Sequence, residues 1–196
     1  MNPKILVFAG SIRTGAYSGK TADAATKELA LQGAEITRIS LADYPLPIMD
    51  QDLEAEEGVP DNAVKLARLF IDHDGILIAT PEYNGSMPPL LKNTIDWISR
   101  VRRDRGIPVR PLAGRVVALC SSSDGHFAGI RSASHLRAVL SHIQMEVIAP
   151  QVSVPHAGEA FDDDGNFHEE RLRNGMERLC RTLIERAAML SPRGPL

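Results

Sequence analysis

The chain contains four short, mostly apolar runs, of which the first is uninterrupted, and each is followed by small or polar residues. The runs cover residues 5–9, 75–79, 116–120 and 145–149. Such runs are typical of strands that are buried on both faces of a parallel sheet. Residues 34–41 instead alternate apolar and polar side chains, which predicts a half-exposed strand near an edge of the same sheet. The pattern therefore predicts five strands.

Apolar residues recur at helical spacing in the stretches between these strands. Residues 64–71 form one such stretch before the third strand, and residues 91–98 form another after it. A closing helix is predicted over residues 169–190. Because strands and helices alternate, we expect parallel strands, right-handed crossovers and a three-layer α/β sandwich. Five such units in 196 residues predict a single flavodoxin-like domain over residues 1–196, with strand order 2-1-3-4-5.

Composition and charge narrow the class of function. The chain has 43% hydrophobic and 24% charged residues, which is ordinary for a globular protein that folds without a metal or a crosslink. Its 22 basic residues against 25 acidic ones give a net charge of −3. This balance offers no electrostatic reason to bind nucleic acid or an anionic membrane. A small-molecule ligand is therefore the more natural partner.

The cysteines and the first residues of the chain favour a cytoplasmic protein. Cys120 and Cys180 lie far apart without the spacing of a zinc site, so we expect two reduced, buried thiols. The apolar run at residues 5–9 is too short for a signal peptide or a membrane span. We therefore expect neither a metal site nor membrane association.

Ligands of an open parallel sheet bind beyond the carboxyl ends of its strands, so the loops there are the candidate sites. The loop after the first strand, residues 10–20, combines glycines with the hydroxyls of Ser11 and Ser18 and the guanidinium of Arg13. Glycines let backbone amides face a ligand, and the N-terminus of the following helix adds partial positive charge. The loop predicts a site for a terminal phosphate, which we favour over a solvated turn.

Two other phosphate signatures nearly match in this loop and fail on spacing. Gly10 and Gly15 fit the outer positions of the dinucleotide motif GxGxxG, but Ile12 fills the middle one. The segment Gly19-Lys20-Thr21 resembles the end of a P-loop, but the first glycine of that motif would fall on Thr14. A dinucleotide-binding Rossmann site is thus disfavoured, and a P-loop phosphotransferase remains a weaker alternative.

Proline and Asn-Gly stiffen the loop after the third strand, which reads Pro81-Glu82-Tyr83-Asn84-Gly85. A planar heterocycle could lie against this loop while the amides of Glu82 to Asn84 hydrogen-bond its edge. The simpler alternative is a rigid turn with Tyr83 packed on a neighbour, and composition alone does not separate the two.

The loop after the fourth strand is small and polar and contains Ser121, Ser123 and Gly125. Such a loop allows its backbone to approach a ligand from the other side of the sheet centre, or it is a flexible turn. His126 is the one histidine in these three loops, and a lone loop histidine is more often a surface residue than an acid or a base.

These loops resemble those of the NAD(P)H-dependent FMN reductase family, which includes quinone, azo-dye and chromate reductases. The family motif GSxRxxSxN matches residues 10–18, except that Ala16 and Ser18 replace its second serine and its asparagine. The longer motif PEYNxSxPGxLKNAIDW matches residues 81–97, except for Pro89 in place of glycine and a threonine in place of alanine.

The resemblance implies a flavodoxin-like flavoenzyme, commonly a homodimer or homotetramer, whose flavin lies beside a subunit interface. Hydride would pass from NADPH or NADH to FMN, and then to a flavin, a quinone or a similar small-molecule acceptor. The cofactor carries this chemistry, so no acid–base side chain is expected to be catalytic. The residues at matching positions are Ser11, Arg13 and Ser18 for the phosphate, Pro81, Glu82, Tyr83 and Asn84 for the isoalloxazine ring, and Ser121, Ser123 and Gly125 beside it.

A flavodoxin-like electron carrier is the main alternative. Such carriers are usually strongly acidic and bind the phosphate without an arginine, whereas this chain has a net charge of only −3 and carries Arg13. The preference between NADPH and NADH stays open. Four arginines either reach the 2′-phosphate of NADPH or form a basic helix end, namely Arg100, Arg102, Arg103 and Arg105.

Overall fold

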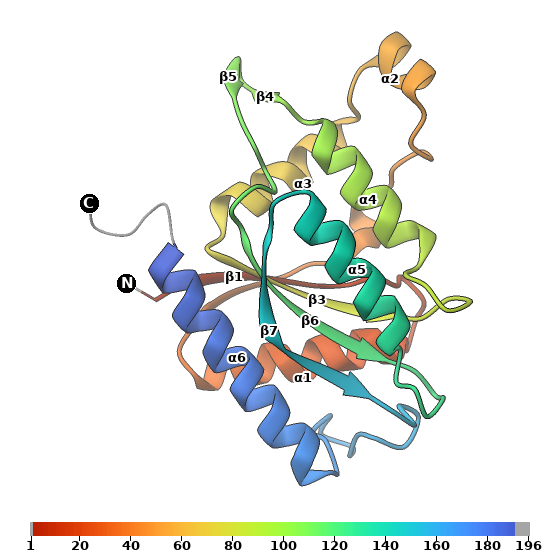
Figure 1. The fold of residues 1–196 in the computed structure, drawn as a ribbon, viewed down its shortest axis with the longest axis vertical. Coiled ribbons are helices and arrows are strands. Elements are labelled where there is room, and N and C mark those ends of the chain that lie inside the picture. The colour runs from red at the N-terminus through yellow and green to blue at the C-terminus, as the bar shows by residue number, and fades with distance from the viewer. Residues whose placement is uncertain (1, 191–196) are drawn as a thin grey trace.

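The computed structural model of this protein describes residues 2–190, built around a five-stranded sheet whose neighbouring strands are all parallel. Across the sheet the strands lie in the order β2-β1-β3-β6-β7 (Figure 1). The predicted five-stranded parallel sheet of flavodoxin-like type is confirmed. Its strands are β1 (Lys4–Ala9), β2 (Glu35–Arg38), β3 (Gly75–Pro81), β6 (Val116–Ser122) and β7 (Glu146–Val154).

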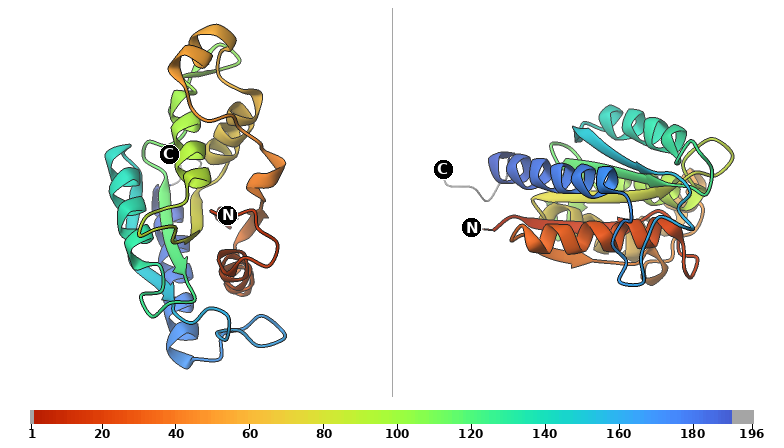
Figure 2. Two further views of the ribbon diagram at one scale, coloured as in Figure 1. Left: turned by 90° about the vertical axis from the view of Figure 1, so that its right-hand side faces the viewer. Right: turned by 90° about the horizontal axis from the view of Figure 1, so that it is seen from below.

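Helices cover both faces of this sheet and make the expected three layers (Figure 2). On one face lie α1 (Tyr17–Leu31) and α6 (Glu170–Leu190), and their buried residues share one apolar core. On the other face, α3 (Asp61–Asp72), α4 (Pro89–Arg100) and α5 (Ile130–His142) share a second core. The short helices η1 (Leu41–Asp43) and α2 (Gln51–Glu57) belong to the connection between β2 and α3.

Strand alternation explains why the central strands read as unbroken apolar runs. Ile5 and Val7 of β1 point into the core beneath α1 and α6, whereas Leu6 and Phe8 point into the core beneath α3, α4 and α5. Both sets of side chains are almost fully buried. A central strand must therefore be apolar at every position, as the sequence pattern indicated.

The edge strand β7 differs from its prediction. The apolar run at 145–149 suggested a short strand buried on both faces, but β7 continues to Val154, and both Glu146 and Ala149 are exposed. An edge strand pairs on one side only, so its faces need less apolar cover than those of a central strand. The polar residues Gln151 and Ser153 extend the strand without an apolar signal.

A two-stranded hairpin between α4 and β6 was not predicted. Its antiparallel strands are β4 (Arg103–Asp104) and β5 (Ile107–Pro108). Arg105 and Gly106 make the turn with φ of 49° and 82°, the left-handed conformation that two-residue hairpin turns require. Strands of two residues are too short to leave an alternating pattern, which explains why the sequence did not indicate them.

The segment of residues 45–50, which we call the strap, lies against α4. Trp97 Nε1 and Asn93 Nδ2 both donate to the carbonyl oxygen of Pro47, each at 2.8 Å. Asn93 Oδ1 in turn accepts from the backbone amide of Met49 at 2.8 Å. The ring of Trp97 is fully buried. Two side chains of α4, Asn93 and Trp97, thus hold the strap in place, and the Trp97 ring is part of the apolar core.

Both cysteines lie in the core, as the sequence predicted. Cys120 and Cys180 are free and buried. Burial raises the pKa of the Cys120 thiol to about 12, and it also raises the pKa of the Cys180 thiol well above its usual value. Within residues 2–190, no helix has the length and apolar character needed to cross a membrane. The same residues contain no cluster of three or more His, Cys, Asp or Glu side chains able to hold a metal ion.

Candidate functional site

Three loops meet at the carboxyl end of the sheet, after β1, β3 and β6. The first two touch at Gly10, whose amide donates to the carbonyl oxygen of Ala79 at 2.8 Å. A Cβ atom on Gly10 would lie 3.1 Å from Leu91 Cδ2 and 3.4 Å from both Pro81 Cδ and Pro88 Cγ. A side chain at this position would therefore be crowded where the first loop packs against the proline-containing second loop and α4.

The first loop holds several hydrogen-bond donors that the protein itself does not use. Ala16 N donates to Arg13 O at 3.1 Å, but six other amides from residue 11 to residue 18 have no partner anywhere in residues 2–190. No side chain caps the N-terminus of α1. The hydroxyl of Ser18 is buried and also lacks a partner in the described structure. The unpaired amides belong to Ser11, Ile12, Thr14, Gly15, Tyr17 and Ser18.

Unpaired donors at a helix N-terminus are suited to an anion. Buried polar groups normally find a partner in the folded protein, so the Ser18 hydroxyl, which has none in the described residues, is a donor still available to a ligand. Ser11 Oγ accepts from Arg13 N at 3.3 Å and shapes the turn. The exposed Arg13 guanidinium donates to Thr14 O at 3.3 Å and lies 5.9 Å from the Tyr17 ring. Ser11 and Arg13 thus line one hollow beside the start of α1, whereas Ser18 is buried in the first turn of that helix.

The second loop is a tight turn that presents only some of the expected amides. Tyr83 and Ser86 exchange two backbone hydrogen bonds of 2.9 and 3.0 Å around Asn84 and Gly85, which have φ of 50° and 80°. The Tyr83 amide is therefore used within the turn. The amides of Glu82 and Asn84 have no partner among residues 2–190, and the Tyr83 side chain is 47% exposed.

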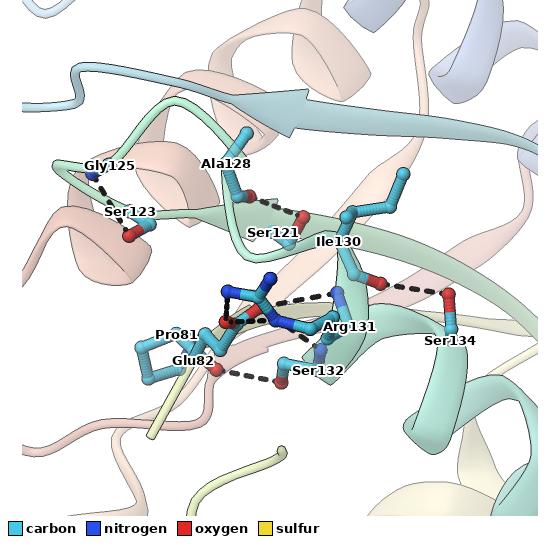
Figure 3. A network of polar contacts seen from close by, with 10 residues as sticks. All are labelled: Pro81, Glu82, Ser121, Ser123, Gly125, Ala128, Ile130, Arg131, Ser132 and Ser134. Carbon is cyan, nitrogen blue, oxygen red and sulfur yellow. Dashed lines mark hydrogen bonds and ion pairs between the residues drawn. The ribbon is translucent and has the colours of Figure 1, made fainter. Parts of the chain in front are cut away.

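The Glu82 side chain turns away from the surface and is only 9% exposed. Its two oxygens contact the first turn of α5, where Arg131 and Ser132 supply the donors (Figure 3). The sequence analysis assigned Glu82 through its backbone and missed this role of the carboxylate. No local pattern could reveal it, because the contact joins residues about fifty positions apart.

The third loop divides its predicted residues between two levels. Ser121 is fully buried in β6, and its Oγ lies 2.8 Å from both Ala128 O and Ser153 Oγ. The hydroxyl of Ser121 therefore links the end of β6 to Ala128 in the third loop. Ser123 Oγ accepts from the Gly125 amide at 3.2 Å, and these two residues shape the loop itself.

Tyr17, Asp124 and Gly158 form a link that the sequence analysis did not predict. Asp124 Oδ1 accepts from the Gly158 amide at 3.1 Å, and Oδ2 accepts from the Tyr17 hydroxyl at 3.5 Å. A Cβ atom on Gly158 would lie 3.0 Å from Asp124 Oδ1. These contacts tie the first loop, the third loop and the segment after β7 together. Only the polar loop composition hinted at them.

Ser122, also missed, has a buried hydroxyl without a partner in the described part of the chain. Strand alternation places Ser122 on the face that α1 covers, the same face as Ser18, and opposite to Ser121. The carboxyl end of the sheet thus has two orphaned hydroxyls on one face. The serine run in the sequence contained this residue, but only the strand register separates its direction from those of its neighbours.

A hollow of about 220 Å³ adjoins the first loop. Arg38 also lines it, and its Nε donates to Asp23 Oδ1 at 3.0 Å, which offsets one of the positive charges there. The exposed Lys20 lies at the same hollow.

The arginines after α4 lie at the other end of the sheet. Because α4 follows the carboxyl end of β3 and leads to the amino end of β6, residues 101–114 are far from the three loops (Figure 1). Arg100 Nε lies 2.8 Å from Glu54 Oε2, and Arg103 Nη1 donates to Gly106 O. Within one chain, these arginines form a basic helix end and hairpin, not a subsite of the three loops.

Comparison with known proteins supports the resemblance. The family model described as NADPH-dependent FMN reductase matches residues 3–159. A quinone reductase of Escherichia coli K12 is 38% identical over 146 residues, covering 74% of this chain and 73% of the relative. An NAD(P)H-dependent FMN reductase of Pseudomonas aeruginosa is 32% identical over 182 residues, or 92% of each chain.

Solved structures agree on the fold. FerB, described as a flavoenzyme NAD(P)H:(acceptor) oxidoreductase from Paracoccus denitrificans, superposes with a TM-score of 0.78 at 23% identity. The superposition covers 94% of this chain and 97% of FerB. Because the family model matches most of the chain, the family assignment is preferred to the two alternatives of a P-loop phosphotransferase and a flavodoxin-like electron carrier. The chain belongs to the NADPH-dependent FMN reductase family, whose members are FMN-dependent NAD(P)H oxidoreductases.

Proposed function

We propose that the three loops at the carboxyl end of the sheet hold FMN, and that the protein transfers electrons from NADPH or NADH to a quinone or a similar small acceptor. The observation that carries this assignment is the first loop, with its unpaired amides and the buried, orphaned hydroxyl of Ser18. A phosphate supplies the acceptors that these donors lack.

The first loop would bind the phosphate through three side chains and its free amides. Ser18 donates from the buried side, Ser11 from the turn, and Arg13 adds a charge-assisted bond from solvent. Because Ser18 stands where the family motif has asparagine, its hydroxyl is the donor at that position. The absence of a hydroxyl at Ala16 leaves the backbone amides to provide the remaining bonds.

The second and third loops would hold the isoalloxazine ring. Pro81 and Tyr83 offer apolar surface, and the amides of Glu82 and Asn84 are free to donate to the ring edge. Ser123 and Gly125 shape the opposite loop, and Ser121 fixes that loop from within the sheet. Donors aimed at the ring edge stabilise negative charge that develops there on reduction.

FMN, when bound, supplies the redox chemistry, which in sum converts NAD(P)H, a proton and a quinone to NAD(P)⁺ and a hydroquinone. The protein places and polarises the cofactor, so we assign no catalytic acid or base. A quinone is the favoured acceptor because two relatives, 38% and 31% identical to this chain, are named as a quinone reductase and a 2-hydroxy-1,4-benzoquinone reductase. The half-exposed Tyr83 and the exposed Phe127 offer aromatic surface near these loops.

We also propose a homodimer or homotetramer in the cytoplasm. Large apolar side chains are exposed around the three loops, which supports burial against a second copy. The two free thiols are consistent with a reducing compartment. The exposed apolar residues are Ile12, Tyr83, Phe127 and Ile130.

Purified protein tests the proposal by absorption and by direct assay. We expect it to take up FMN, to show flavin bands, and to oxidise NADPH or NADH when 1,4-benzoquinone is present without a partner protein. Arg13→Ala should raise the Kd for FMN about tenfold, the value of one charge-assisted hydrogen bond. A colourless wild type that binds no FMN, or an Arg13→Ala variant with unchanged affinity, would contradict it.

A further inference from the structure

We propose that Glu82 is a positioning residue, which joins the second and third loops through the N-terminus of α5 and so sets their spacing around FMN. This inference rests on the proposed function and deepens it. It concerns the side chain of Glu82, whereas the ring-binding role above concerns the backbone.

The first observation is the direction and burial of the carboxylate. Oε1 accepts from Arg131 Nε at 2.9 Å and lies 2.6 Å from Arg131 Nη2. Oε2 accepts from the amides of Arg131 and Ser132 at 3.2 and 3.4 Å. Both oxygens are thus occupied by α5, and the side chain is 9% exposed (Figure 3). A carboxylate used in this way is unavailable to a ligand.

The second observation is that α5 has no cap of its own. Its N-cap residue is Gly129, no side chain caps it, and its first turn contains no acidic residue. Helices usually supply this function with a Ser, Thr, Asp or Asn at the N-cap and an acid nearby. Glu82 provides the acceptor and the negative charge from another loop. The start of α5 therefore depends on the second loop.

The third observation is a parallel set of bonds beside the carboxylate. Ser132 Oγ donates to Pro81 O at 2.8 Å and lies 2.9 Å from Thr80 Oγ. Three consecutive residues, 80 to 82, are thus tied to one turn of helix. Only Glu82 brings a charge to this contact, so it is the member that both caps the helix and pairs with Arg131.

The start of α5 also determines the course of the third loop. Ala128 and Gly129 lead into the helix with φ of 56° and 75°, and Ser121 Oγ lies 2.8 Å from Ala128 O. A Cβ atom on Gly129 would lie 3.2 Å from Ser121 Cβ, so this passage has little room to shift. A displacement of the α5 N-terminus would therefore move the third loop relative to the second.

The Arg131 side chain also pairs with Glu82. Its guanidinium lies between the carboxylate and the Phe127 ring, 4.9 Å from the ring centroid, and its side chain is 52% exposed. The pair carries no net charge, so its effect on FMN is one of placement. Removing Arg131 would leave the capping bonds of Glu82 intact, whereas removing the Glu82 carboxylate breaks both contacts.

The test compares Glu82→Ala, Glu82→Gln and Arg131→Ala by titrating the apoprotein with FMN and following flavin fluorescence. We expect Kd to rise about tenfold for Glu82→Ala and less for the other two, because each of them keeps part of the capping. At saturating FMN, Glu82→Ala should also shift the visible flavin spectrum and the flavin midpoint potential. Arg131→Lys should recover part of the affinity lost in Arg131→Ala.

Glu54→Gln is the matched control. Glu54 also pairs with an arginine, at 2.8 Å from Arg100 Nε, and is mostly buried, but it lies on α2 away from the loops. Its replacement should change neither the Kd for FMN nor the spectrum of the complex. A purely structural role of Glu82 would lower the melting temperature and leave the spectrum of the saturated complex unchanged, which would overturn the inference.

Hydrogen exchange of the apoprotein keeps the inference separate from the FMN assignment. The amides of Arg131 and Ser132 should exchange faster in Glu82→Ala than in wild type, with or without flavin. Unchanged exchange together with unchanged FMN affinity would reject the positioning role. A wild type that binds no FMN would instead reject the proposed function, even if the exchange result matched the expectation.

Discussion

The two ends of the sheet treat their polar groups in opposite ways. At the amino end, two arginines are paired within the chain, through bonds from Arg68 to Asp104 at 2.6 to 3.1 Å and from Arg100 to Glu54, although Arg115 Nε is buried there without a hydrogen-bond partner in the described residues. At the carboxyl end, the first loop leaves amides and the Ser18 hydroxyl without partners in the described residues. Since buried polar groups are normally satisfied, the unpaired Ser18 hydroxyl costs stability, which fits the proposal that this end binds a ligand.

The largest effect should come from filling the space at Gly10. Gly10→Val places side-chain atoms against Leu91, Pro81 and Pro88. We expect a loss of about 1–3 kcal/mol in the free energy of unfolding and a rise of more than about tenfold in the Kd for FMN, because the first two loops must separate. Urea denaturation and FMN titration measure the two quantities.

Gly106→Ala is the control at the amino end. No atom lies within 4 Å of its Cβ position, but its φ of 82° disfavours a side chain. It should cost about 1 kcal/mol of stability and leave FMN affinity unchanged. If both variants weakened FMN binding equally, the contrast between the ends would not hold.

A change at Ser18 should have opposite effects on stability and binding. Ser18→Ala removes a buried hydroxyl that lacks a partner, so the apoprotein should gain about 1 kcal/mol in the free energy of unfolding. The Kd for FMN should rise roughly tenfold, because the phosphate loses a donor. Thermal unfolding with and without FMN reads both effects. A variant that loses stability without flavin would show that the hydroxyl already has a use in the free protein.

The smallest effect should come from the amino end, through the pH dependence of one ion pair. The hydrogen bond from Arg68 and its positive charge hold the pKa of Asp104 below its usual range. A carboxyl with a lowered folded pKa stabilises the protein above its unfolded pKa of about 3.9, and this contribution disappears as the pH falls through the folded pKa. Wild type should therefore exceed Asp104→Asn in stability at pH 7.

At pH 3 the difference in the free energy of unfolding between wild type and Asp104→Asn should be smaller. Urea denaturation at the two pH values measures it. The Kd for FMN at pH 7 should be the same for both proteins. A difference that grew toward low pH would contradict the assignment of Asp104 as the paired, ionised partner.

Much of the fold follows from local patterns, and the exceptions have a common cause. Unbroken apolar runs marked β1, β3 and β6 because central strands are covered on both faces. The second half of β7 and the hairpin at 103–108 were not predicted, because an edge strand and a two-residue strand do not need apolar periodicity. Their structure depends on pairing and turn conformation, which single residues signal only weakly.

The loops of the candidate site could be found from the sequence, but the directions of their side chains could not. Strand ends and glycines located the first loop, in which Ser11 accepts a turn hydrogen bond and Ser18 has an unpaired hydroxyl in the described residues, whereas their role in binding stays a prediction. The contact of Tyr17 with Asp124 spans 107 residues, and the turn of Glu82 toward α5 depends on an uncapped helix elsewhere. Such contacts arise only when the layers are assembled.

The contact between α4 and the strap shows that the long motif at residues 81–97 combines residues of two different roles. Its first part lies in the second loop, whereas Asn93 and Trp97 use their polar groups to hold residues 45–50. A descendant that abandoned flavin but kept its architecture would retain these two side chains and still be retrieved by a search with the motif. A match at Asn93 and Trp97 therefore indicates common ancestry and a shared fold. Within this motif, only the residues near Glu82 bear on flavin binding.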